Sequence, residues 1–135
     1  MEINLPYKVK MSVNEMYFQR RRGKFLKKEA LNLRALIMED VKRFIENEDT
    51  GEVENLKDKI LTVGIIFTED WNYKNGEIKR EDLDNRLKFI LDSIFIALDF
   101  DDKYIFELYA RKNQSENANY TTIIINEAKE WDEQP

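Results

Sequence analysis

The 135-residue sequence contains no cysteine and no histidine. Without cysteine the chain has neither a disulfide nor thiolate chemistry, and without histidine it has no imidazole base or nucleophile. A Ser-His-Asp triad and a histidine-containing zinc site are therefore excluded. If the chain is an enzyme, its chemistry must come from carboxylates, lysine, tyrosine, hydroxyl groups or a metal ion.

Proline, glycine and long apolar runs are also scarce. Two prolines and four glycines are present, which argues against a repetitive or disordered chain. No run approaches the ~18 apolar residues of a membrane span, and the N-terminus lacks a secretory-signal pattern. With 42% hydrophobic residues, the chain is expected to form a single domain over residues 1–135 with a packed core. We expect a bacterial or phage-encoded protein of the cytoplasm with no membrane partner.

Charge is divided unevenly along the chain. Residues 1–34 contain nine lysines and arginines and three glutamates, a net charge of +6. Because the net charge of the whole chain is −5, residues 35–135 carry −11. Residues 10–26 form a basic loop or arm, and 127–135 an acidic tail. The bland interpretation is a solvated basic loop, whereas the functional one is an arm that neutralises phosphates and stacks on bases. The candidate DNA-binding residues are Tyr17, Arg20, Arg21, Arg22, Lys24, Lys27 and Lys28.

Apolar periodicity predicts an α+β domain of βαβαββ order, with two main helices packed on a small mixed sheet. Residues 2–9 are typical of an edge strand, because Pro6 disfavours a central position. Helical spacing of apolar residues predicts two helices, and β-branched or alternating runs predict three further strands. The helices are expected over about 27–46 and 83–98, and the strands over 59–67, 104–111 and 120–126. We expect the last two strands to form a hairpin across a polar turn.

An acidic segment around the second predicted helix is the most informative feature. Asp82 and Asp84 precede the helix, and in an extended lead-in alternate side chains point to the same side. Lys88 lies one turn into the helix, and Asp101-Asp102 follows it. Grouped carboxylates suit Mg²⁺, and a lysine beside them suits a phosphate. The segment therefore indicates a metal-dependent enzyme that acts on phosphodiesters.

The same residues also have a purely structural interpretation. Aspartate is favoured at helix N-caps, and acidic residues in a first turn complement the helix dipole. Asp84 and Lys88 have the i,i+4 spacing of a surface ion pair, and Asp101-Asp102 could be a polar turn. Spacing alone leaves both interpretations open. It also leaves open whether Asp101-Asp102 returns to the start of the helix.

A family resemblance rests on these motifs. The segment Lys79-Arg80-Glu81-Asp82-Leu83-Asp84-Asn85-Arg86-Leu87-Lys88, with Asp92 and Asp101-Asp102 after it, resembles the signature of the RusA family of Holliday-junction resolvases. Leu5-Pro6, Ser12-Val13-Asn14, Tyr17 and the helix with Arg34 follow the family's order. The resemblance implies a homodimeric, Mg²⁺-dependent endonuclease that nicks paired strands at four-way DNA junctions in recombination and repair. Mn²⁺ is expected to substitute for Mg²⁺.

The resemblance also implies roles for individual residues. Asp82, Asp84 and Asp102 match the family's metal-binding aspartates, and Lys88 matches its essential lysine. These four are the predicted catalytic residues, and further candidates are Asp101, Asp92 and Asn85. The spacing from the helix to the acidic pair is slightly shorter than in the best-known member, which leaves Asp101 and Asp102 both open as the third ligand. The alternatives are a broader branched-DNA nuclease, or a non-catalytic nucleic-acid-binding module with the same fold.

Overall fold

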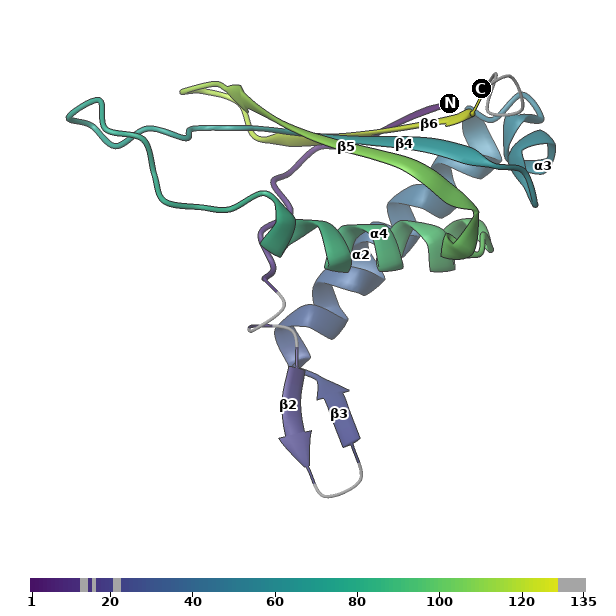
Figure 1. The fold of residues 1–135 in the computed structure, drawn as a ribbon, viewed down its shortest axis with the longest axis horizontal. Coiled ribbons are helices and arrows are strands. Elements are labelled where there is room, and N and C mark those ends of the chain that lie inside the picture. The colour runs from purple at the N-terminus through teal and green to yellow at the C-terminus, as the bar shows by residue number, and fades with distance from the viewer. Residues whose placement is uncertain (13–14, 16, 21–22, 129–135) are drawn as a thin grey trace, which may run out of the picture.

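A computed structural model describes residues 1–12, 15, 17–20 and 23–128. Its centre is a four-stranded mixed sheet of order β1-β6-β4-β5. The strands are β1 Glu2–Leu5, β4 Leu61–Glu69, β5 Ile105–Gln114 and β6 Tyr120–Glu127. Both main helices, α2 (Lys28–Asn47) and α4 (Asp84–Leu98), lie on the same face of this sheet (Figure 1). The predicted α+β class, the βαβαββ order of the main elements and the edge position of the first strand are confirmed.

The core lies between the two helices and one face of the sheet. Side chains alternate along a strand, so Val63, Ile65 and Phe67 of β4 all point to the helices and are fully buried. Helix α4 contributes Ile90 and Ile94 at i,i+4 spacing, both buried. Each such side chain stabilises the fold by about 1.5–3 kcal/mol relative to an exposed position. The apolar patterns that predict these elements are therefore the ones that form the core.

The predicted hairpin between the last two strands is wrong. Strand β5 pairs parallel to β4, and β6 pairs antiparallel to β4 on its other side. The reason is that α4 carries the chain back from the end of β4 to its start, so β5 runs in the same direction as β4. Strand β4, the most continuously apolar of the three, takes the central place between β5 and β6. Residues 115–119 therefore cross over β4 instead of forming a tight turn.

Two further segments differ from the predicted loops. The basic segment 10–26 contains an antiparallel pair of short strands, β2 (Tyr17–Arg20) and β3 (Gly23–Leu26), which projects away from the sheet in Figure 1. The acidic connection after α2 contains a short helix, α3 (Glu52–Leu56). The predicted acidic tail begins inside β6 at Glu127, and residues 129–135 lie outside the described residues. No helix in the described part of the chain has the length and apolar character of a membrane span.

Candidate active site

Asp82 and Asp84 lie exposed at the start of α4. The helix begins at Asp84, its N-cap residue is Leu83, and no side chain makes a capping hydrogen bond. Neither carboxylate has a hydrogen-bond or ion-pair partner among the residues that the structure describes. The interpretation of these aspartates as side-chain caps is therefore wrong. Asp84 still occupies the first turn, where negative charge is favoured, but the oxygens of both side chains are available to a ligand.

A pocket of about 190 Å³ opens beside Asp82. Its lining combines carboxylates, positive side chains and uncharged polar groups. The lining residues are Lys10, Ser12, Glu15, Arg80, Glu81, Asp82, Asn85 and Arg86. Asn85, one of the additional candidates, thus shares a pocket with Asp82. Carboxylate oxygens next to cationic side chains are the combination that binds a divalent cation together with a phosphate.

Arg86 supports this pocket from the interior of the protein, and the sequence analysis missed it. The side chain is only 3% exposed. Its guanidinium donates to both carboxylate oxygens of Glu69, the last residue of β4, and to the main-chain oxygen of Val9 from Nε (3.1 Å) and Nη2 (2.6 Å). Its Cζ lies 4.5 Å from the ring centroid of Phe67 and 5.0 Å from that of Trp71. All these partners lie outside α4, so Arg86 joins three segments of the chain.

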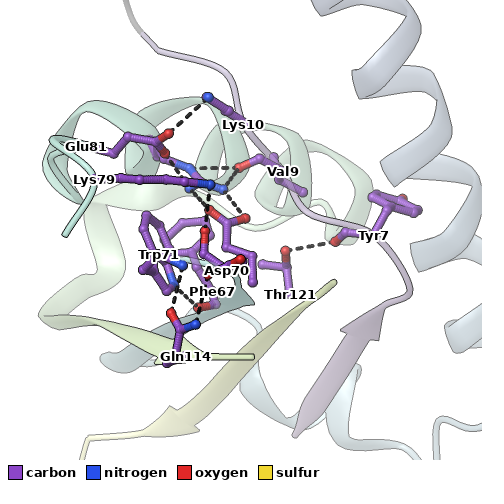
Figure 2. A network of polar contacts seen from close by, with 12 residues as sticks. Tyr7, Val9, Lys10, Phe67, Asp70, Trp71, Lys79, Glu81, Gln114 and Thr121 are labelled. Carbon is purple, nitrogen blue, oxygen red and sulfur yellow. Dashed lines mark hydrogen bonds and ion pairs between the residues drawn. The ribbon is translucent and has the colours of Figure 1, made fainter. Parts of the chain in front are cut away.

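The contacts of Arg86 extend to the residue before Asp82. Glu81 accepts a hydrogen bond from Arg86 at 3.4 Å and pairs with Lys10 at 3.0 Å. Partial burial alone would raise the pKa of Glu81, but the hydrogen bond and charge of Lys10 and the charge of Arg86 lower it below its usual value. In Figure 2, Val9 and Lys10 belong to the chain that leads to the basic arm, and Glu81 to the loop before α4. This Arg86 cluster (Val9, Lys10, Glu69, Glu81 and Arg86) fixes the position of Asp82 relative to the start of the arm.

Lys88 lies one helical turn beyond Asp84 and is exposed. Its ammonium Nζ lies 3.3 Å from Oδ2 of Asp92, so the expected ion pair with Asp84 is wrong. Asp84, Lys88 and Asp92 follow one another at i,i+4 spacing along one side of α4. An exposed pair of this kind contributes about 0.3–0.5 kcal/mol. Lys88 can therefore exchange Asp92 for a phosphate at little cost.

Asp101 and Asp102 lie beyond the other end of α4. The Asp101 carboxylate accepts a hydrogen bond from the main-chain nitrogen of Lys103 at 2.9 Å and caps the one-turn 3-10 helix η1 (Asp102–Tyr104). The Asp102 side chain is exposed and has no hydrogen-bond or ion-pair partner within the described residues. Asp92, Asp101 and Asp102 share a pocket of about 470 Å³. Of the two adjacent aspartates, Asp102 is thus the one with an uncommitted carboxylate.

Helix α4 separates the two groups of aspartates. It contains 15 residues, which at a rise of 1.5 Å per residue span about 22 Å. Across the described residues, no group of three or more acidic side chains is placed to hold a metal ion. One chain brings Asp82 close to Asp84 in sequence and space, but it keeps Asp102 at the far end of the helix. A metal ion shared by all three stays a prediction.

The predicted DNA-binding residues follow the projecting hairpin and the start of α2. Strand β2 includes Tyr17 and Arg20, and β3 includes Lys24. Lys27 is the N-cap residue of α2 and Lys28 is its first residue. Arg21 and Arg22 lie outside the described residues. The backbone therefore places this basic segment on a projection of the molecule, which suits contact with an extended polyanion.

Comparison with models of protein families shows to which family the chain belongs. Residues 6–126 match the family model of the endodeoxyribonuclease RusA. The chain belongs to the RusA family. The match spans the basic arm, the Arg86 cluster and both groups of aspartates, and it confirms the resemblance drawn from the Asp82–Lys88 motif. No curated protein matches the chain.

Arg34 is a second arginine with a defined position in this RusA domain. Its Nε donates to Oγ of Ser93 at 3.1 Å, and its Cζ lies 5.4 Å from the ring centroid of Phe89. Both partners are buried residues of α4, so Arg34 joins α2 to α4. It also lines the larger pocket together with Asp102. Arg34 therefore gives the pocket at the far end of α4 a positive side chain.

Proposed function

We propose that this RusA-family chain is a Mg²⁺-dependent endonuclease that resolves four-way DNA junctions by paired, symmetric nicks during recombination and repair. One observation carries the proposal. Asp82 and Asp84 are exposed at the start of α4, make no capping hydrogen bond to the helix, and lie about one helical turn before Lys88. Because neither carboxylate makes a hydrogen bond or ion pair within the described residues, such contacts do not account for their presence. Exposed carboxylate oxygens are the ligands of a hard divalent cation.

The exposed carboxylates at the start of α4, of which Asp82 lines the smaller pocket, fit Mg²⁺. Asp82 and Asp84 supply oxygen ligands at exposed positions, where the ion keeps several of its waters. When bound, the ion would polarise the scissile phosphate and lower the pKa of a water molecule. Lys88 would leave Asp92 and neutralise the charge that accumulates on the phosphate in the transition state. Asn85 would hold the phosphate or the water in place through its amide.

Two copies of the chain are needed for the proposed reaction. Paired nicks at symmetric positions require two active sites that a two-fold axis relates. Since Asp102 follows the far end of α4, a helix about 22 Å long that begins at Asp84, we propose that Asp102 of a second copy completes each metal site. Two α4 helices that lie antiparallel across the axis would place Asp102 of one copy beside Asp82 and Asp84 of the other.

The proposed reaction predicts a specific cleavage pattern. A labelled four-way junction and a linear duplex of the same sequence are incubated separately with Mg²⁺, with Mn²⁺ and with EDTA. We expect paired, symmetric nicks in the junction alone, and only with a metal ion. Equal cutting of duplex, flaps or forks would instead support the broader branched-DNA nuclease. Junction binding without cutting in either metal would identify a nucleic-acid-binding module that lacks the chemistry.

The basic arm predicts a change in the salt dependence of binding. Replacement of Arg20, Arg21 and Arg22 by glutamine should weaken junction binding. The slope of log K against log salt concentration should become less negative by about 0.9 for each phosphate that the arm no longer neutralises. Fluorescence anisotropy in EDTA at several salt concentrations measures this slope without cleavage. Glutamine at Lys42 and Lys74, which are exposed outside the arm, is the matched control. An unchanged slope in the triple variant would exclude the arm as a phosphate contact.

A further inference from the structure

The segment that connects β4 to α4 forms a small hairpin over residues 71–79, which we call the β4–α4 hairpin. Asn72 and Ile78 form an antiparallel bridge across it. Beside this bridge the main-chain nitrogen of Tyr73 donates to the main-chain oxygen of Glu77 at 2.7 Å. In Figure 1 the hairpin is the teal loop that extends beyond the end of β4, and it projects in a different direction from the basic arm.

The tip of the hairpin has a defined backbone conformation. The main-chain nitrogen of Gly76 donates to the main-chain oxygen of Tyr73 at 2.9 Å and closes the turn. Gly76 has a φ of 87°, in the left-handed region that favours glycine, and a turn that ends in such a glycine is a common form of short hairpin. The side-chain oxygen of Asn75 accepts from the main-chain nitrogen of Glu77 at 3.0 Å. The turn is therefore held without the side chain of Tyr73.

The base of the hairpin is anchored beside the Arg86 cluster. Trp71 is only 4% exposed, and its ring Nε1 donates to the main-chain oxygen of Phe67 at 3.1 Å. Its main-chain nitrogen donates to the side-chain oxygen of Gln114 in β5 at 2.7 Å (Figure 2). Its ring centroid lies 5.0 Å from Cζ of Arg86. The hairpin therefore has a fixed attachment close to the cluster that positions Asp82.

Each face of the hairpin carries an exposed apolar side chain. Tyr73 is 54% exposed, and Ile78, at 71%, has the largest exposed fraction among the large apolar side chains that the structure describes. Ile78 faces Asn72 across the bridge, and Tyr73 is the next residue after Asn72. Because consecutive side chains in extended chain point to opposite sides, Tyr73 and Ile78 lie on opposite faces. A narrow projection with an apolar side chain on either face has the form of a wedge.

Positive charge accompanies these two side chains. Residues 71–80 contain three lysines and arginines and one glutamate, a net charge of +2, whereas residues 35–135 as a whole carry −11. Lys74 at the tip and Arg80 are exposed, and neither has a hydrogen-bond or ion-pair partner among the described residues. Arg80 also lines the pocket beside Asp82. Exposed cations next to an exposed aromatic ring suit nucleic acid, because the cations contact phosphates and the ring stacks on bases.

We propose that the β4–α4 hairpin inserts at the branch point of the DNA junction, with Tyr73 against the terminal base pair of one arm and Ile78 against that of the neighbouring arm. The inference deepens the proposed function and rests on it, because it assigns a contact to the feature that distinguishes a junction from linear duplex. Apolar side chains are known to wedge between base pairs, and in continuous duplex they must first unstack them. At a branch point the stacking is already interrupted.

The distance between the hairpin and the start of α4 fits this contact. Lys79 precedes Asp82 by three residues, which span at most about 11 Å of extended chain. Successive base pairs are about 3.4 Å apart, so Lys79 lies within about three base pairs of a phosphate bound at Asp82. In Figure 1 the start of α4 lies between the hairpin and the basic arm. The hairpin would therefore hold the branch point close to the strand that is cut, while the arm holds the neighbouring phosphates.

Binding without a metal ion tests the wedge. Fluorescence anisotropy in EDTA compares the Kd for a four-way junction with the Kd for linear duplex of the same sequence. Tyr73→Ala should raise the junction Kd about tenfold, the loss of one aromatic stacking contact, and should leave the duplex Kd unchanged. Tyr73→Phe keeps the ring and should bind like the unmodified chain. Ile78→Ala should weaken junction binding in the same selective way.

Two controls identify the kind of contact. Neither Tyr73→Ala nor Ile78→Ala removes a charge, so the slope of log K against log salt concentration should stay unchanged, in contrast to the loss of arginines from the basic arm. Tyr120→Ala removes a tyrosine that is 41% exposed on β6 and should leave both Kd values unchanged. Circular dichroism should give the same spectrum for all variants, because the substituted side chains lie outside the core.

A cross-link locates the tip of the hairpin on the DNA. Because the chain lacks cysteine, Lys74→Cys introduces a single thiol at the tip. A junction with a thiol-tethered base at the branch point should form a disulfide with this variant. The same tether placed one helical turn into an arm, about 10 base pairs away, should not. Tyr120→Cys should cross-link to neither.

The two measurements separate the wedge from the nuclease activity. Equal junction affinity of Tyr73→Ala and the unmodified chain, or a cross-link as efficient in the arm as at the branch point, would overturn the wedge even if the unmodified chain cuts junctions. A selective loss of junction affinity together with the branch-point cross-link supports the wedge even if no cleavage occurs in Mg²⁺. In that case the proposed nuclease chemistry fails and the branch-point contact stands.

Discussion

Arg86→Met should lower the free energy of unfolding by about 3–5 kcal/mol, because the removal of one member of a buried ion pair leaves the other charge uncompensated. Glu69, only 4% exposed, would lose both of its guanidinium hydrogen bonds. Val9 would lose the donors to its main-chain oxygen. Urea denaturation followed by circular dichroism measures the change. Few single substitutions elsewhere in the chain should have a comparable effect.

Two control variants identify the cause of this loss. Arg43→Met removes an exposed arginine of α2 that pairs with Asp40 at 3.0 Å, and should change stability by at most about 1 kcal/mol. The double variant Arg86→Met with Glu69→Met removes both charges and should recover part of the loss, since apolar side chains can replace a buried pair. A loss in Arg86→Met no larger than that in Arg43→Met would show that the buried pair does not anchor the fold.

The Arg86 cluster shows which part of the site local sequence patterns predict. Arg86, Ile90 and Ile94 stand at i,i+4 spacing, so an arginine occupies the apolar side of a predicted helix, where a charge requires a partner. That spacing indicates that the Arg86 side chain is buried. It does not identify the partners, because Glu69 and Val9 are 17 and 77 residues away in sequence. Only the tertiary fold brings them to Arg86.

The same limit explains the error in the sheet. The run from Leu61 to Glu69 and the segment from Tyr120 to Glu127 both have the β-branched composition of strands, and both form strands in the structure. The composition does not show which strands pair. Two strands that are consecutive in sequence and joined by a polar turn can form a hairpin, or each can pair with a third strand between them, as β5 and β6 do with β4. The crossover through α4 and the central position of β4 result from packing of the whole core. Local periodicity therefore predicts the elements and leaves their pairing open.

The sequence likewise predicts the position of only part of the acidic motif. Asp82, Asp84 and Lys88 are close in sequence, so their common position at the start of one helix follows from helical geometry. The place of Asp102 depends on the direction in which α4 runs and on the strand that follows. Helix α4 carries the chain away from Asp84, so two parts of one motif lie at opposite ends of this helix. A symmetric dimer is the simplest arrangement that reunites them.

Mixtures of two inactive variants should regain cleavage if the metal site is shared between chains. Asp84→Asn or Asp102→Asn alone should slow cleavage by about a thousandfold, because the ion stabilises the transition state by several kcal/mol and each ~1.4 kcal/mol is tenfold in rate. In a mixed dimer, one site contains both substitutions and the other contains neither. An equimolar, fully exchanged mixture should therefore hold about one quarter of the intact sites of the unmodified dimer. The products should be single nicks, since each mixed dimer has one working site.

A matched mixture tests whether the recovered activity requires carboxylates from both copies. Asp82→Asn and Asp84→Asn lie at the same end of α4, so a dimer of these two variants has one substitution in each site and should stay inactive. If Asp102 instead served the metal site of its own chain, the mixture of Asp84→Asn with Asp102→Asn would be equally inactive. Denaturing gel analysis of end-labelled junction strands measures single and paired nicks in all mixtures. Recovery in the first mixture alone requires that Asp82 and Asp84 act with Asp102 of the other copy, which is the arrangement that an α4 helix about 22 Å long leads us to propose.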